Sequence, residues 1–408
     1  MDAVTDYLTK LQQHTTTQLC RRYGDNFRGQ TKVEYVLTVP AVWSDAAKNA
    51  TLLAAERAGM GTRYDIKLIS EPEAAALYTL KTFLPSFIQV GHNLIVCDAG
   101  GGTVDIIAYR VTQRQPLKIE ESAIGTGSLC GSTFLNYRFE DHVKQRLGEA
   151  RYQDMKDNKP RTWQMALKYF EESVKRNFNE AELQDFSIPM PGIDDDEEAG
   201  VDGGFLILTA EDTKDIFDPI VNQVIGLVEG QVDAIVSKDE VVSAVILVGG
   251  FGQSNYLYTK LKSHFNRGGE EAQPGNGEET PVATSRNIEV VQPLHAWTAV
   301  VRGACLRGLE GSIVVNRRSR WHYGTSYATV FDEMKHPIAD RYWSPLWERW
   351  MVSDRMAWHI AKVYYQFGIR IFLLTVFDRA LESPNVPPSP FTTLATLDGV
   401  SHLLWKTN

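Results

Sequence analysis

Two apolar segments that meet at three consecutive glycines constrain the fold of this chain more than any other feature. The stretch NLIVCDAGGGTVDIIAYRV, residues 93–111, is rich in β-branched side chains on both sides of the glycines, which predicts two strands joined by a tight turn. Consecutive glycines let backbone N–H groups approach an anion closely, and Thr103 adds a hydroxyl donor. Asp98 and Asp105 flank the turn, and carboxylates in small number suit Mg²⁺, which also takes phosphate and water oxygens. From these residues alone, a magnesium and phosphate turn and a plain strand hairpin with a glycine bulge both stay open.

Strands and helices alternate on both sides of this turn. The run VEYVLTVPAVW predicts a buried strand that Pro40 ends, because proline cannot donate to a sheet ladder. Ser44 can cap the helix that follows, and Gly59 can close it. Further along we expect a short strand leading into an alanine-rich helix at 66–80, a long amphipathic helix at 213–236, and a buried strand ending at a double glycine at 241–252. The alternation predicts a layered α/β domain.

Composition narrows the partners that we expect. Among 408 residues the formal net charge is −9, which disfavours sequence-independent binding of nucleic acid through its phosphates. The start of the chain is polar, unlike a signal peptide, and the apolar run at 367–377 is too short to span a bilayer. Four cysteines lie far apart without a CxxC or zinc pattern, which is typical of reduced thiols. We therefore expect a cytoplasmic protein without nucleic-acid or membrane partners. A stretch rich in Gly, Glu and Pro at 268–281 predicts a mobile loop.

Several common catalytic motifs do not fit the sequence. There is no GxxxxGK[ST] for a P-loop, no GxSxG for a nucleophile elbow and no HExxH for a zinc protease. The glycines of GTGSLCG, residues 125–131, are spaced as GxGxxxG, which differs from the dinucleotide fingerprint. These absences leave the glycine turn with its two aspartates as the strongest chemical signal.

Six segments in order resemble the nucleotide-binding domain of the heat shock protein 70 family of chaperones. They are TVPAVWSDAAKNAT, ISEPEAAAL, DAGGGTVD, GTGSLCGSTF, FEESVKRNF and ILVGGFGQS. The resemblance covers about residues 4–311 and implies an α/β, actin-like ATPase (ribonuclease H-like) fold with two lobes around a nucleotide cleft. It places the remainder of the first lobe at 1–92, the second lobe at 93–311 with a helical and β subdomain at about 133–210, and a C-terminal segment of uncertain structure at 312–408.

The resemblance also implies roles for individual residues, with ATP or ADP and Mg²⁺ as cofactors. Catalysis falls to Glu71, which would orient the attacking water, and to Asp98, Thr103 and Asp105, of which the two aspartates would hold the metal. The nucleotide-binding residues are Gly100, Gly101, Gly102, Thr103 and Gly131 at the phosphates, Glu172, Lys175 and Arg176 as an adenosine clamp, and Gly249 and Gly250 against the nucleotide. Without the resemblance, Glu71 also fits a simple helix N-terminal acid. The clamp, spaced i, i+3, i+4 on one helix face, also fits a solvated charged face.

Departures from the family pattern lower the ATP turnover that we expect. The hairpin carrying the first phosphate loop, the small subdomain after it with its catalytic lysine, and the peptide-binding β-sandwich are not recognisable. Cys130 replaces a glycine, Phe251 and Gln253 replace a serine and an arginine, and Leu294 replaces an aspartate. Because phosphoryl transfer needs charge neutralisation from several sides, these losses predict weak turnover.

The first hypothesis is therefore an ATP-binding, chaperone-type ATPase with protein clients or co-chaperones as partners. A non-catalytic scaffold with a degenerate nucleotide cleft is the main alternative. An incomplete version of a longer ATPase stays open as well, whereas the clamp segment FEESVKRNF argues against a sugar kinase.

Overall fold

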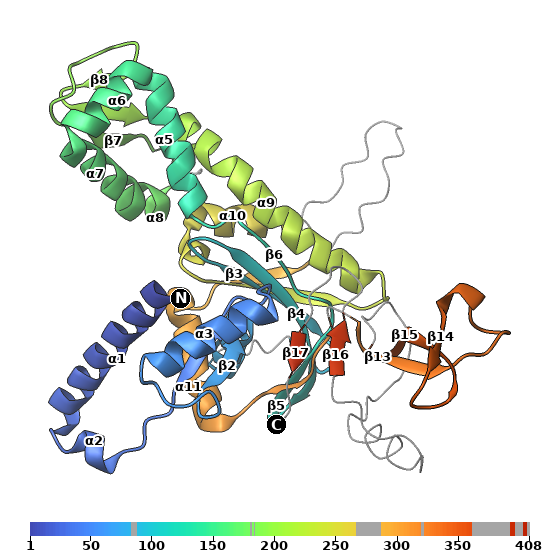
Figure 1. Ribbon diagram of the computed structural model, residues 1–408. Coiled ribbons are helices and arrows are strands. Elements are labelled where there is room, and N and C mark those ends of the chain that lie inside the picture. The colour runs from blue at the N-terminus through green and yellow to red at the C-terminus, as the bar shows by residue number, and fades with distance from the viewer. Residues whose placement is uncertain are drawn as a thin grey trace. The chain divides into compact units, whose positions relative to one another are not determined.

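The computed structural model divides the chain into two compact units, Met1–Asn316 and Arg317–Asn408 (Figure 1). It describes residues 1–82, 88–179, 182, 184–266, 287–319, 322–360, 392–395 and 403–405. The segments 268–281 and 367–377, predicted above as a mobile loop and a short apolar run, lie outside the described residues. No helix within the described part of the chain has the length and apolar character needed to cross a membrane. The predicted division between lobes at residues 92 and 93 stays a prediction.

A mixed seven-stranded sheet forms the centre of the first unit. Its order is β11-β10-β3-β4-β5-β12, with β6 paired to β4. Strand β10 runs parallel to β3 and β11, whereas β3, β4 and β5 are antiparallel. The bounds are β3 (Asn93–Ala99), β4 (Val104–Arg114), β5 (Leu117–Glu121), β6 (Thr126–Ser128), β10 (Val242–Val248), β11 (Glu289–Val291) and β12 (Val314–Asn316). The structure confirms the predicted mixed α/β architecture and the two strands on either side of the glycine turn.

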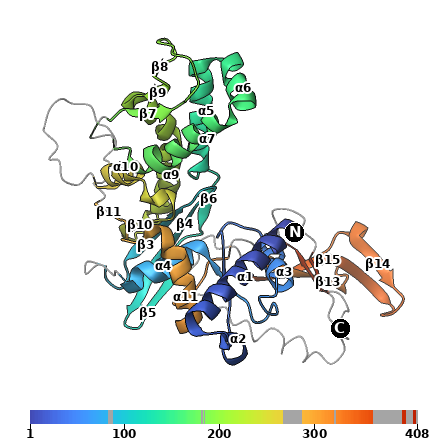
Figure 2. The ribbon, with the colours of Figure 1, turned by 90° about the vertical axis from the view of Figure 1, so that its left-hand side faces the viewer.

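Helices cover both faces of this sheet, which explains why every residue of β3 is buried. Successive side chains of a strand point to opposite faces. Ile95 and Cys97 pack in the core formed with α5, α9 and α10, and Leu94 and Val96 pack in the core formed with α4 and α11 (Figures 1 and 2). The helices are α4 (Glu71–Thr82), α5 (Thr133–Leu147), α9 (Ala210–Val236), α10 (Asn255–Phe265) and α11 (Ala299–Glu310).

A second, two-stranded parallel sheet joins β1 (Val36–Val39) and β2 (Lys67–Ser70). Strand β1 ends immediately before Pro40, as predicted. Ser44 caps the next helix, because its side-chain oxygen accepts a hydrogen bond of 3.3 Å from the N–H of Ala47. The helices of this part are α1 (Asp2–Tyr23), α2 (Phe27–Gln30) and α3 (Asp45–Arg57).

A helical and β region packs around the first half of α9. Its three-stranded sheet has the order β7-β9-β8. Its elements are α6 (Glu149–Asn158), α7 (Pro160–Tyr169), the π-helix η1 (Phe170–Val174), α8 (Lys175–Asn177), β7 (Phe186–Pro189), β8 (Val201–Asp202) and β9 (Phe205–Leu208). Phe139, Phe170 and Phe217 belong to the same core as one face of the large sheet, so helix α9 connects the two parts (Figure 1).

Helix α9 contains a proline whose effect is offset by an arginine from α5. The helix starts at Ala210, three residues before the predicted start, because Thr209 and Asp212 form a capping box. Pro219 lies inside it and lacks the N–H that would bond the carbonyl four residues earlier, at Asp215. Arg138 donates from its guanidinium to the carbonyl oxygens of Asp215 and Ile216, at 2.9 Å each. The side chain thus replaces the bond that the proline removes.

Replacing Arg138 with Met should lower the free energy of unfolding by about 1 kcal/mol, because the Asp215 carbonyl loses its partner. In a Pro219→Ala background the alanine restores the missing N–H, so the same Arg138 substitution should cost clearly less. Urea denaturation of the wild type, both single variants and the double variant measures this coupling. An equal cost of Arg138→Met in both backgrounds would contradict the assigned role of the arginine.

Helices α4 and α11 approach each other unusually closely (Figure 2). A Cβ atom placed on Gly303 would lie 1.7 Å from the carbonyl oxygen of Ala74. An ion pair between Lys81 and Glu310 joins the far ends of the two helices. The glycine is therefore a packing requirement of this face of the large sheet.

Replacing Gly303 with Ala should destabilise the protein by about 1–3 kcal/mol or more, because backbone must move to admit the methyl group. Gly226, an exposed helical glycine of α9 with open space around it, is the matched control. Its replacement by Ala should stabilise by about 0.5–1 kcal/mol through helix propensity. Thermal and urea denaturation of the two variants should therefore shift in opposite directions.

The second unit holds an antiparallel sheet of order β14-β15-β13-β16-β17. Its strands are β13 (Tyr323–Val330), β14 (Arg341–Ser344), β15 (Arg349–Ile360), β16 (Thr392–Ala395) and β17 (Leu403–Trp405). Trp343 and Trp350 are cross-strand partners, with ring centroids 5.6 Å apart. The sequence analysis left this segment without a predicted structure, although the aromatic and β-branched residues of β13 and β15 are typical of strands.

Candidate functional site

The two aspartates at the glycine turn face each other across the β3–β4 hairpin. Asp98 on β3 pairs directly with Asp105 on β4, and residues directly opposite in antiparallel strands share a face. Both are buried, with relative exposures of 7% and 1%. They lie on the face that α4 covers, and Glu71 is the first residue of that helix. The register thus brings three predicted site residues from separate elements to one place.

Burial and the charges of neighbouring acids raise the pKa values of two of these carboxyl groups, those of Glu71 and Asp98. Burial, followed by the charge of Asp105, raises the pKa of Glu71 to about 7. Burial, followed by the charges of Glu71 and Asp105, raises the pKa of Asp98 to about 7. Neither shift has a basic side chain among its causes. The backbone N–H of Val42 donates to Asp105 Oδ1 at 3.3 Å. The arrangement is a concentration of negative charge that a cation would stabilise.

A magnesium ion fits this chemistry. Within the described residues, His, Cys, Asp and Glu do not form any group of three or more that could hold a metal alone. Mg²⁺ binds through one or two carboxylates and completes its shell with water and phosphate oxygens, so Asp98 and Asp105 match its preference.

The glycine turn is packed backbone to backbone against the start of α5. The N–H groups of Ser132 and Thr133 donate to the carbonyls of Gly100 and Gly101, at 3.1 and 2.8 Å. A Cβ atom on Gly131 would lie 2.4 Å from the Gly101 oxygen, so any other residue there would push the two turns apart. The N–H of Gly100 itself bonds the Thr103 carbonyl at 2.9 Å, which closes the turn.

A third glycine turn follows β10, beside the same strand end. Because β10 is parallel to β3, with Val248 level with Asp98, Gly249 lies against Ala99. Gly249 has a φ of +90°, and a Cβ atom there would lie 2.3 Å from the Ala99 oxygen and 2.6 Å from Asp98 Oδ1. A Cβ atom on Gly250 would meet nothing within 4 Å. Ligands of α/β sheets bind at the carboxyl ends of parallel strands, which is where these turns meet.

The predicted adenosine clamp lies at the junction of the π-helix η1 and α8. Glu172 and Arg176 are exposed, whereas burial lowers the pKa of Lys175 to about 8, partly offset by Glu171. Lys175 Nζ lies 4.0 Å from Glu171 Oε1, in an i, i+4 ion pair. Just after the clamp, the rings of Phe178 and Tyr256 lie 4.7 Å apart and connect it to α10, the helix that follows the Gly249 turn.

Comparisons with known proteins identify the family of this chain. The Hsp70 protein family model matches residues 13–274, more than half of the chain. The chain belongs to the Hsp70 family. Heat shock 70 kDa protein 12A of Homo sapiens is 22% identical over 426 residues, which cover 86% of this chain and 58% of that protein. Heat shock 70 kDa protein 12B of Homo sapiens is 24% identical over 422 residues, with 85% and 57% covered. The chain thus spans less than two thirds of the length of these curated relatives.

Four residues that depart from the Hsp70 pattern differ in their surroundings. Phe251 is buried in the core on one face of the sheet, whereas Gln253 is exposed in the turn that follows Gly249. Leu294 is 89% exposed. Cys130 is fully buried and points into the core with Cys97. Burial raises the pKa of its thiol to about 11, so it replaces a glycine without adding a charge.

Sequence reasoning missed Val42 and Gly127. Gly127 packs with its Cα close to both Val42 and Asp105: a Cβ atom there would lie 3.0 Å from Val42 Cγ1 and 3.3 Å from Asp105 Oδ1. Gly127 belongs to the segment GTGSLCG, so its glycine spacing was a signal of close approach. The N–H of Val42 carries no signal in sequence, because any residue but proline offers the same donor.

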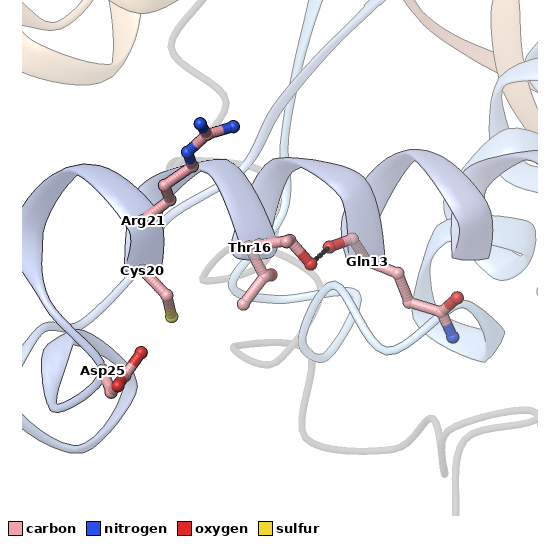
Figure 3. A pocket seen from close by; sticks show the side chains of 6 residues that line it. Gln13, Thr16, Cys20, Arg21 and Asp25 are labelled. Carbon is pink, nitrogen blue, oxygen red and sulfur yellow. Dashed lines mark hydrogen bonds between the residues drawn. The ribbon is translucent and has the colours of Figure 1, made fainter.

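A hollow of about 490 Å³ on helix α1 and the turn after it is separate from this site (Figure 3). It is lined by Gln13, Thr16, Thr17, Cys20, Arg21 and Asp25. The candidate site residues do not line it, and its walls come from adjacent turns of one helix and the residues just beyond it.

The raised pKa values of Glu71 and Asp98 predict a pH dependence of stability when no divalent cation is present. An acid whose pKa is higher folded than unfolded holds more protons in the folded state, so the free energy of unfolding falls as pH rises between the two pKa values. The stability that the protonated Glu71 and Asp98 contribute should therefore be lost as pH rises from their ordinary pKa values near 4 to the raised values of about 7.

Urea denaturation between pH 4.5 and 7.5 in the presence of a chelator measures the effect. Asp98→Asn should remove part of this decline, whereas Asp195→Asn, at an exposed acid of the 192–204 loop, should leave it unchanged. Parallel pH profiles for the wild type and Asp98→Asn would contradict the coupling of the carboxyl groups.

Proposed function

We propose that this Hsp70-family chain is an ATP- and ADP-binding protein with a magnesium-dependent nucleotide site at the β3–β4 turn. The observation that carries the proposal is the group of Glu71, Asp98 and Asp105, which concentrates buried negative charge beside three glycine turns. Isolated buried charges are costly, and such groups are retained where a cation and a ligand complete them.

Each element of the site would have a distinct task toward the nucleotide. Asp98 and Asp105 would hold Mg²⁺, which when bound neutralises phosphate charge. The Gly100–Gly102 turn would offer backbone N–H groups and close approach to phosphate oxygens. Glu71, with its raised pKa, would orient a water or accept its proton. Glu172, Lys175 and Arg176 would contact adenosine, with Gly250 leaving open space beside it.

The proposed turnover is weak. Hydrolysis of ATP needs positive charge on more than one side of the transferred phosphoryl group. Among the described residues, the charges that act on Glu71 and Asp98 are those of acids, so a bound metal would supply positive charge there. We therefore propose a chaperone-type nucleotide switch in which binding outweighs catalysis, with protein clients or co-chaperones as partners.

A non-catalytic scaffold is the second candidate. Leu294 favours it, because the position that holds an aspartate in the family pattern here offers no carboxylate to a nucleotide site. The aspartate pair is not needed for such a role, so nucleotide binding discriminates the two candidates.

Titration calorimetry with ATP and ADP in the presence of Mg²⁺ tests the proposal. The wild type should bind both in the micromolar range, and Asp98→Asn should weaken binding at least tenfold, because half of the aspartate pair is lost. Asp195→Asn, on an exposed loop, should bind like the wild type. A folded, monodisperse wild type that binds neither nucleotide would refute the proposal and favour the scaffold.

A further inference from the structure

Backbone hydrogen bonds, which do not depend on the identity of the side chains, hold part of the turn after β10. The N–H of Gly249 donates to the Ala296 carbonyl at 3.1 Å, and the N–H of Ser254 donates to the Phe251 carbonyl at 2.9 Å. Both bonds join backbone atoms. Side chains hold the turn as well. Phe251 is buried in the core, the Ser254 hydroxyl accepts from the N–H of Leu257 at 3.4 Å, and Gln292 Nε2 donates to the Gly252 carbonyl at 2.6 Å in a partly buried setting.

The topology explains why Gln292 reaches this turn. It directly follows β11, which lies parallel to β10 with Val291 level with Ile246. Both strands therefore end at the same edge of the sheet. The glutamine side chain spans from the end of one strand to the 3-10 turn η3 (Phe251–Gln253), which begins three residues beyond the end of the other.

The position of this turn determines how a nucleotide could lie in the site. On one side Gly249 contacts Ala99 and Asp98 so closely that no side chain fits between them. On the other side Gly250 faces open space. The hydrogen bond from Gln292 fixes the position of the turn and therefore of the Gly250 backbone. Small displacements of a binding surface lower its affinity for a ligand.

We propose that Gln292 is a positioning residue for the nucleotide turn, acting through the Gly252 carbonyl. The inference rests on the proposed function, because the turn matters to the nucleotide only if the site binds one. Gln292 is neutral, so it fixes the turn without adding charge near the Asp98 and Asp105 carboxylates.

Two isosteric variants separate the hydrogen bond from the shape of the side chain. Gln292→Met removes the donor, and Gln292→Glu places a carboxylate against the Gly252 carbonyl at neutral pH. Binding of adenosine, MgADP and MgATP is measured by calorimetry at pH 5 and pH 7.5, with every affinity expressed relative to the wild type at the same pH. Thr162→Val is the matched control, because it removes a buried 2.7 Å bond to the Pro191 carbonyl away from the turn.

Gln292→Met should weaken all three ligands about tenfold at both pH values, because the turn contacts the part of the nucleotide that they share. Gln292→Glu should weaken them more at pH 7.5 and recover toward the wild type at pH 5, because its partly buried place against the Gly252 carbonyl raises the pKa of the new carboxyl group, and the protonated form donates the missing bond. A purely structural defect would not show this recovery. Thr162→Val should lower the melting temperature without changing relative affinity.

Hydrogen exchange of the Gly249 and Ser254 amides, measured without nucleotide, completes the test. Faster exchange in Gln292→Met than in the wild type, with unchanged exchange along β3, is expected. Wild-type affinities in both folded Gln292 variants would overturn the inference and leave the proposed function intact. Loss confined to MgATP would overturn it too, because it would place the effect at the phosphates. A wild type that binds none of the ligands would overturn the proposed function and this inference with it, whatever the exchange rates.

Discussion

The register between β3 and β4 is the constraint on which the rest of the site depends. It places Asp98 opposite Asp105 with both side chains on one face, at the closed end of a hairpin whose strands are buried. Two like charges in such a place repel each other and lose hydration, so they persist only where something else compensates. A one-residue slip of either strand would move its aspartate to the opposite face, among the apolar side chains of α5 and α9. The cost of burying a carboxylate there opposes that slip, and the core therefore fixes the position of the aspartates.

At three positions around this hairpin the space admits only glycine. Gly131, Gly249 and Gly127 each lie so close to backbone or to Asp105 that a Cβ atom would collide. Gly127 lies in strand β6, whereas Gly131 and Gly249 belong to turns from different parts of the chain. These turns meet because β10 is parallel to β3 and because α5 starts beside the Gly100–Gly102 turn. The close packing has a chemical consequence: the aspartates are surrounded by backbone and excluded from most water, which strengthens their response to any cation or phosphate.

Local sequence signals predicted several helices and strands around the site, whereas contacts between distant residues could not be predicted from them. The two strands around the glycine turn, the Ser44 cap and the start of a helix near Glu71 follow from periodicity and capping chemistry, and the structure confirms them. The π-helix at Phe170–Val174 was missed because its sequence pattern resembles that of an α-helix. The roles of Val42 and Gln292 depend on the sheet order, which joins residues far apart in sequence. The sheet of the second unit lacked turn signals strong enough to reveal its strands.

The distribution of charge in this site would affect the binding of a nucleotide and its hydrolysis differently. Binding of a magnesium nucleotide gains from every feature described: an aspartate pair for the metal, backbone N–H groups for phosphates and an open face at Gly250. Catalysis requires in addition that charge be stabilised as it develops between the phosphoryl group and the leaving oxygen. The charges that raise the pKa values of Glu71 and Asp98 come from neighbouring acids, and such acids would oppose that charge. Under the proposed function, the site would therefore favour binding of a nucleotide over its hydrolysis, as in a switch that responds to the presence of nucleotide.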